Sequence, residues 1–149
     1  MTKLLLAVHV LAAIVAVGPV TVAASMFPPA ARRAMAAPDD VRAAQTLGLL
    51  HRICRVYAVV GLVVPVFGFA TANRMGVLGS AWLIVSIALT ALAALVLAAL
   101  VLPAQTVLVE GGGTRTRTVR LAMFTGVFNL LWAAVTILMI VRPGSTTGA

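Results

Sequence analysis

Charged residues divide the chain into four long apolar stretches that are separated by polar connections. The first stretch, Leu4 to Ala31, contains no Asp, Glu, Lys or Arg. Each stretch approaches or exceeds the roughly 20 residues that a helix needs to cross about 30 Å of hydrocarbon. The pattern therefore predicts an all-α membrane protein, folded as a single four-transmembrane-helix bundle. We expect the membrane-spanning helices at about residues 4–27, 53–72, 80–102 and 119–141.

Prolines and an acidic pair mark the expected boundaries in the first half of the chain. Phe27-Pro28-Pro29 is expected to end the first helix, because a residue that precedes proline disfavours the α conformation. Residues 30–50 are then predicted to form a cytoplasmic loop that contains the start of an extended helix. Asp40 is placed to cap that helix, which extends the second membrane span into the cytoplasm.

The remaining prolines and glycines predict bends and further connections. Pro19 and Pro65 are expected to bend the first and second helices, since proline cannot donate the hydrogen bond of its turn. Pro103 is expected to end the third helix. Residues 103–118, with three consecutive glycines and the run Thr-Arg-Thr-Arg, are predicted to form a flexible basic loop.

Composition indicates that lipid is the solvent of this chain. Hydrophobic residues make up 62% of the sequence and charged residues only 9%, against about 25% in soluble domains. The net charge of +8 comes mostly from arginines that flank the apolar stretches, as in membrane anchoring, so no nucleic-acid partner is expected. Cys54 is the single cysteine, which excludes an intrachain disulfide and predicts a small buried hydrophobe.

The arginines also predict an orientation. The positive-inside bias places both termini outside and the two longer connections in the cytoplasm, as a multi-pass protein of a bacterial plasma (inner) membrane. The first stretch is longer than the roughly 7–15 apolar residues of a signal peptide, so we expect it to remain as a helix. Three basic residues lie on the outer side, namely Lys3, Arg74 and Arg142, and eight lie on the inner side, namely Arg32, Arg33, Arg42, Arg52, Arg55, Arg115, Arg117 and Arg120.

His9 is the first candidate for chemistry. It lies about six residues into the first helix, or roughly 9 Å deep at 1.5 Å per residue. An ionisable side chain inside a membrane span is a functional-site hypothesis, and a neutral imidazole can ligate haem iron or relay a proton. The alternative is a structural hydrogen bond to Ser86 or Thr136, which we count with the polar residues that pack helices together.

His51, Arg52 and Arg55 form a second candidate site at the cytoplasmic start of the second span. Their spacing of three and four residues places cationic groups on one helix face. Such a cluster can bind a lipid phosphate, a haem propionate or an acidic partner, or it can simply anchor the helix among headgroups. His9 and His51 are expected to lie most of a bilayer apart, so they cannot share one metal ion.

Asn129 is the remaining polar side chain expected within the membrane, where it either holds helices together or contacts a substrate. The three acidic residues, Asp39, Asp40 and Glu110, all fall in predicted connections. This placement argues against a carboxylate-driven pump and against hydrolysis by paired carboxylates. We assign no catalytic residue, and the chain is more consistent with a protein that is not an enzyme.

A family resemblance adds to this interpretation. The opening Ala7-Val8-His9-Val10-Leu11-Ala12-Ala13, followed by Gly18-Pro19, resembles the first helix of small bacterial membrane proteins called domain of unknown function 2269. Similar openings occur in copper-resistance D-type proteins and membrane protoporphyrinogen oxidases, and the likeness covers about residues 4–72. It implies a four-helix bundle with His9 as a haem ligand. Those relatives carry Trp-Phe or Trp-x-Gly after the histidine, whereas this chain does not, so oxidase activity is not implied.

Three functions follow as hypotheses. The favoured one is an accessory or assembly subunit of a larger membrane complex, which packs its helices against other membrane subunits or a second copy of itself. The second is a haem-binding, redox-linked membrane protein with His9 as axial ligand. The third is a transporter of a small solute or metal, which would need a polar path that these helices hardly provide. The lipid bilayer is the one partner common to all three.

Overall fold

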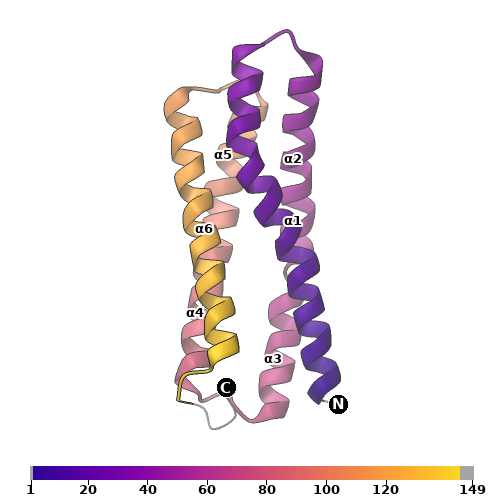
Figure 1. Ribbon diagram of the computed structural model, residues 1–149, viewed down its shortest axis with the longest axis vertical. Helices are drawn as coiled ribbons and strands as arrows, with labels where there is room; N and C mark the ends of the chain where they lie inside the picture. Colours follow the sequence, from indigo (N-terminus) through magenta and orange to yellow (C-terminus); the bar gives the residue numbers. More distant parts are fainter. Residues whose placement is uncertain (1, 145–149) are drawn as a thin grey trace.

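A computed structural model describes residues 2–144 of the chain, and every regular element within them is helical. Four helical segments are long and apolar enough to cross a membrane, which confirms the all-α, four-helix fold. Figure 1 shows them as an elongated bundle, with the start of α1 and the end of α6 at the same end. The elements are α1 (Thr2–Ala36), α2 (Val41–Val60), α3 (Val63–Met75), α4 (Ala81–Leu95), the π-helix η1 (Val96–Val101), α5 (Leu102–Val109) and α6 (Arg115–Val141).

The predicted end of the first helix at Phe27 is wrong, because α1 remains helical through both prolines to Ala36. Phe27 and Pro28 are buried, and Phe27 belongs with Ala31 to the main core. Packing of this last part of α1 against the bundle compensates for the backbone hydrogen bonds that the prolines cannot donate. Figure 1 shows α1 changing direction along its length while it stays a single helix.

The connection predicted for residues 30–50 is much shorter in the structure. Only Ala37–Asp40 separates α1 from α2. The predicted helix start is confirmed, since the Asp40 carboxylate accepts hydrogen bonds from the backbone N–H groups of Arg42 and Ala43. We call the end of the bundle that carries this turn and the α5–α6 turn the basic end.

The bend expected at Pro65 lies one turn earlier in the chain. Helix α2 ends at Val60, and α3 begins at Val63 after a turn at Gly61 and Leu62. Pro65 has no N–H to donate to the Gly61 carbonyl, which accepts from the Val64 N–H at 3.1 Å instead. The proline therefore breaks the second segment beside the carbonyl to which it cannot donate, and the Val64 N–H takes its place.

The predicted helix end at Pro103 is also wrong. The third segment widens into η1 immediately before Pro103 and then continues as α5 to Val109. The Leu102 N–H bonds to the Leu97 carbonyl, five residues back, so the wider turn accommodates a proline that a regular helix would exclude. The expected flexible loop over residues 103–118 shrinks to Glu110–Thr114, where Thr114 caps α6 through the Arg117 N–H.

The core of the bundle is concentrated toward the basic end. Its main cluster joins the second half of α1 to α2, η1, α5 and α6, and includes Phe27, Leu50, Cys54, Val101 and Leu121. A smaller cluster at the opposite end contains Ala72, Trp82 and Leu83. The Arg142 guanidinium lies 5.7 Å from the centre of the Trp82 ring and covers that cluster.

Candidate functional site

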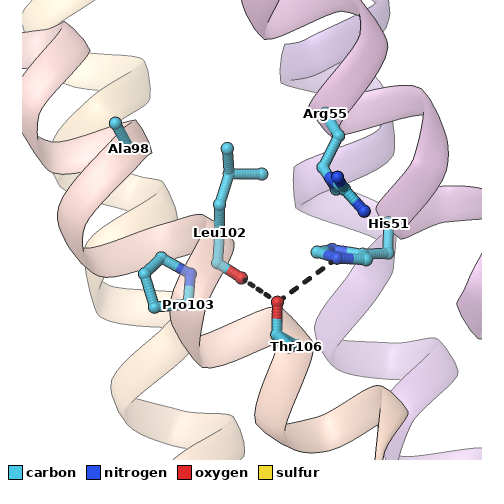
Figure 2. Close-up of a pocket in the computed structure, with 6 residues that line it drawn as sticks. All are labelled: His51, Arg55, Ala98, Leu102, Pro103 and Thr106. Atoms are coloured by element: carbon cyan, nitrogen blue, oxygen red, sulfur yellow. Dashed lines mark hydrogen bonds between the residues drawn. The ribbon is translucent and has the colours of Figure 1, made fainter.

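A groove of about 540 Å³ opens between α2 and the segment formed by η1 and α5. Figure 2 shows the nitrogen-bearing side chains of His51 and Arg55 on the α2 wall, facing apolar residues of the other wall. The groove thus combines polar donors on one side with an apolar surface on the other. Its lining consists of His51, Arg55, Ala98, Leu102, Pro103 and Thr106.

Helix geometry brings these residues together. His51 and Arg55 are four residues apart on α2, and Leu102 and Thr106 are four residues apart on α5, so each pair shares one helix face. Figure 2 shows the Arg55 side chain directed toward the level of His51, one turn away on the same helix. Pro103 lies in the first turn of α5, directly after the π-helix.

Both ring nitrogens of His51 contact side chains of α5. His51 is only 9% exposed, and its Nδ1 lies 3.0 Å from the Gln105 Oε1 atom. Its Nε2 lies 3.3 Å from the Thr106 hydroxyl oxygen. These contacts fix the imidazole plane at the groove wall, because each ring nitrogen has a polar partner on the same neighbouring helix.

Gln105 completes the network and is a residue that the sequence analysis missed. It is 0% exposed, and its amide nitrogen donates to the Cys54 sulfur at 3.5 Å. Cys54 is fully buried, as predicted. The sequence analysis missed Gln105 because the residue fell within the region predicted as a loop, and its contact with His51 forms only when α5 packs against α2.

The predicted cluster of His51, Arg52 and Arg55 is divided by the structure. His51 and Arg55 line the groove, whereas Arg52 does not, and both arginines are exposed. The groove lining contains no acidic residue, and Asp39 and Asp40 lie in the turn before α2. The lining therefore presents positive charge and hydrogen-bond donors without a carboxylate, which is the chemistry of an anion site.

A second and smaller hollow of about 350 Å³ lies along the start of α6. It is lined by Arg115, Thr116, Val119, Arg120 and Met123. Arg117 points elsewhere, since its guanidinium donates to the Gly112 carbonyl. All the polar residues of this hollow are exposed, so it resembles a charged helix face more than a built site.

His9 packs against α3 at another level of the bundle. Its Nδ1 lies 2.9 Å from the Val64 carbonyl oxygen, and its ring occupies the space beside Gly68. A carbonyl can only accept, so Nδ1 carries a hydrogen and donates it, and Nε2 is the nitrogen that this bond does not use. Gly68 and His51 are separated by about 25 Å of helix at 1.5 Å per residue, which agrees with the prediction that the two histidines lie far apart.

The predicted hydrogen bond from His9 to Ser86 or Thr136 is wrong. Both hydroxyls donate to the carbonyl four residues earlier in their own helices, Ser86 to Trp82 and Thr136 to Trp132. Each hydroxyl therefore has its hydrogen-bond acceptor in its own helix, as is common for Ser and Thr in helices. They do not link helices through hydrogen bonds.

Asn129 does join two helices. Its amide nitrogen donates to the Ser25 hydroxyl of α1 at 3.1 Å, which matches the structural alternative of the sequence analysis. The Asn129 Oδ1 atom and the Thr125 hydroxyl, one turn apart, are buried without a hydrogen-bond partner. This pair strengthens the α1–α6 contact only partly, because two polar atoms stay unpaired.

Neither family models, nor curated proteins, nor solved structures gave a match to this chain. Within residues 2–144, no group of three or more His, Cys, Asp or Glu side chains is placed to hold a metal ion.

The His9–Gly68 contact leads to a stability prediction. A Cβ on residue 68 would lie 2.7 Å from the His9 Cε1 atom, so Gly68→Ala should lower the free energy of unfolding by about 1–3 kcal/mol. Gly126→Ala is the matched control, because a Cβ there meets nothing within 4 Å. Thermal unfolding in detergent measures both variants. Equal stability of the two would contradict the tight His9–Gly68 packing.

Proposed function

We propose that the protein is an accessory, non-catalytic protein of a bacterial plasma membrane and that it binds an anionic amphiphile in the groove between α2 and α5. The observation that carries this proposal is the lining of that groove. A buried His51 and an adjacent Arg55 face an apolar wall of Leu102 and Pro103, with no carboxylate in the lining. A charged headgroup and an apolar tail would each find a complementary surface there.

The expected depth of the groove supports a lipid-like ligand. A hydrocarbon layer of about 30 Å corresponds to about 20 helical residues. Counted from Met75 at the end of α3, this length reaches Arg55, and counted from Ala81 at the start of α4 it reaches Val101. The groove would therefore lie where hydrocarbon meets the headgroups at the basic end, which is the depth of a lipid phosphate.

Electrostatics favour an anion at this boundary. The Arg55 guanidinium offers several N–H donors in a plane, which suits the oxygens of a phosphate or carboxylate. A cation near hydrocarbon is costly unless it reaches water or meets an opposite charge. An anionic headgroup between Arg55 and His51 would supply that charge.

This proposal keeps the accessory role that the sequence favours, but it assigns that role to lipid binding in the groove and not to helix packing against a partner. Association by small-residue helix faces is supported less well, because Ala16 is only 1% exposed and faces Gly61 within the bundle. One face of α1 that would suit a partner helix is therefore occupied by α2. Lipid contact through the groove is better supported than partner contact through this face.

Haem binding through His9 is a second candidate function. It is favoured by one observation, the bond between Nδ1 and the Val64 carbonyl, which leaves the Nε2 lone pair available as a ligand. His9 would then supply one nitrogen ligand, and bound iron would supply electron-transfer chemistry. The transporter hypothesis stays a prediction of the sequence alone.

The groove predicts a specific loss of lipid binding. Arg55→Gln should weaken binding of phosphatidylglycerol by about 10- to 100-fold, because a charged hydrogen bond contributes about 1.5–3 kcal/mol. Native mass spectrometry of the detergent-purified protein, titrated with phosphatidylglycerol or phosphatidylcholine of the same acyl chains, measures this effect. Arg52→Gln is the matched control on the same helix. Equal loss in both variants, or equal binding of the two lipids, would contradict a specific groove.

The proposed orientation predicts which turns face the outside. In a Cys54→Ala background, Leu78→Cys in the α3–α4 turn should react with a membrane-impermeant maleimide on intact cells. Ala37→Cys in the α1–α2 turn should react only after permeabilisation. Labelling is read on gels, with the Cys54→Ala parent as the blank. The reverse pattern would refute termini on the outside.

Haem binding predicts a visible spectrum. Protein purified from cells supplied with a haem precursor should show a Soret band that shifts on dithionite reduction and is lost in His9→Ala. The spectra of both proteins, oxidised and reduced, make the comparison. A colourless wild-type preparation would rule out this second function.

A further inference from the structure

We propose that Ala98 determines which ligand the groove accepts. The ligand is an anionic phospholipid that lies like the lipids of the bilayer, with one acyl chain leaving the groove past Ala98 toward the membrane interior. This inference rests on the proposed function, because it specifies the ligand of the same site and how that ligand lies there. It follows from the order of the lining residues along the groove and from the helix surface that continues the groove.

The lining of the groove changes from polar to apolar along the η1–α5 wall. Thr106, which contacts His51, lies toward the basic end. Ala98 precedes Thr106 by eight residues, which places it about 12 Å away along the helix axis at 1.5 Å per residue. Figure 2 shows Ala98 and Thr106 at opposite ends of this wall, with Leu102 and Pro103 between them. The polar and the apolar part of a ligand would therefore lie at opposite ends of the groove.

The two ends of this wall fall on opposite sides of the expected hydrocarbon boundary. A membrane-spanning length counted from Ala81 places that boundary at Val101. On this count Thr106 lies about 8 Å outside the hydrocarbon, and Ala98 lies about 5 Å inside it. The Arg55 side chain is directed back toward the polar end (Figure 2). A bilayer lipid has the same order, with its phosphate among the headgroups and its acyl carbons beneath them.

Ala98 has the smallest side chain of the apolar wall, and it lies where an acyl chain has to leave the groove. Ala98 is exposed, and so is Ala94, which lies one turn earlier on the same helix face. These two positions present only methyl groups, whereas the neighbouring Leu95 is larger and 63% exposed. Two alanines in succession therefore leave room for a hydrocarbon chain against the helix.

The surface that continues the groove is apolar on both walls. Helix α4 contains no charged residue, and the hydroxyls of Ser86 and Thr90 both donate to carbonyls four residues earlier. On the other wall, Val59 follows Arg55 one turn deeper in α2 and is 67% exposed. A polar group below Ala98 would lose its hydration against this surface, whereas an acyl chain would not. The acyl chain is therefore the part of a ligand that fits there.

Ala98→Leu tests the exit of the chain. The larger side chain should fill the space beside Ala94, so the headgroup and the chain cannot both be seated, and binding of phosphatidylglycerol should weaken by about tenfold or more. Native mass spectrometry of the detergent-purified protein measures this affinity. Ala99→Leu is the matched control and should bind as wild type, because residue 99 is an exposed alanine of the same π-helix outside the groove lining.

Fluorescence quenching locates the chain while Ala98 and Ala94 stay unchanged. A small fluorophore is attached to Leu95→Cys, and phosphatidylcholine vesicles contain either phosphatidylglycerol or phosphatidylcholine with a nitroxide in the middle of one acyl chain. Labelled phosphatidylglycerol should quench more strongly, and Arg55→Gln should remove that preference. The native Cys54 is fully buried, so the wild-type protein treated with the same fluorophore serves as the blank.

Val127→Cys is the matched control for depth. Val127 and Leu95 are both exposed, and each lies 14 residues from the end of its membrane segment opposite the basic end, Val141 or Ala81. The two expected depths are therefore equal, but Val127 lies on α6 and outside the groove lining. At this position the two labelled lipids should quench equally.

Two results would overturn this inference and leave the proposed function standing, provided that binding still depends on Arg55. One is wild-type affinity in Ala98→Leu, or an equal loss in Ala98→Leu and Ala99→Leu. The other is equal quenching by the two labelled lipids at Leu95→Cys. Wild-type protein that binds phosphatidylglycerol no better than phosphatidylcholine would overturn both proposals. Glycerol 3-phosphate that competes with equal affinity would show that no chain is bound and would also overturn both.

Discussion

The fold depends on one constraint, which is that polar groups within an apolar bundle must find hydrogen-bond partners in the protein itself. Hydroxyl side chains meet it locally, as when Thr71 and Thr118 donate to carbonyls four residues earlier. Near two prolines the helix geometry changes so that the carbonyls find other donors. A turn precedes Pro65, and a π-helix precedes Pro103. The His9 ring and the Asn129 amide nitrogen meet the constraint across helices, whereas the Asn129 Oδ1 atom and the Thr125 hydroxyl are exceptions without a partner.

At the basic end, the same need for hydrogen-bond partners holds the side chains beside the groove in place. His51, Gln105 and Cys54 form a connected polar network within the main core, next to a groove whose other wall is apolar. Buried networks of this kind hold side chains in one geometry because each member leaves a neighbour unpaired if it moves. Each ring nitrogen of His51 therefore has its own partner on α5, Gln105 for Nδ1 and Thr106 for Nε2.

Hydropathy predicted the number and class of the helices, because four long apolar runs are typical of helices of membrane-spanning length. The Asp40 cap was also predictable, since its bonds are local to the sequence. The ends at Phe27 and Pro103 were mispredicted, because contacts with distant helices outweigh the local effect of proline. His51 and Arg55 were found from their spacing, whereas Gln105 and Leu102 were not. Their role arises only when α5 lies against α2, and no local pattern contains that contact.

The π-helix has a consequence for the direction of the side chains that follow it. A π-turn holds one residue more than the α-turn that it replaces, so everything after η1 is rotated by about 100° relative to a regular helix. Gln105 and Thr106 both follow η1, and both face His51. Removing one residue from η1 would therefore rotate Gln105 and Thr106 together away from His51, while leaving the hydropathy of the helix unchanged.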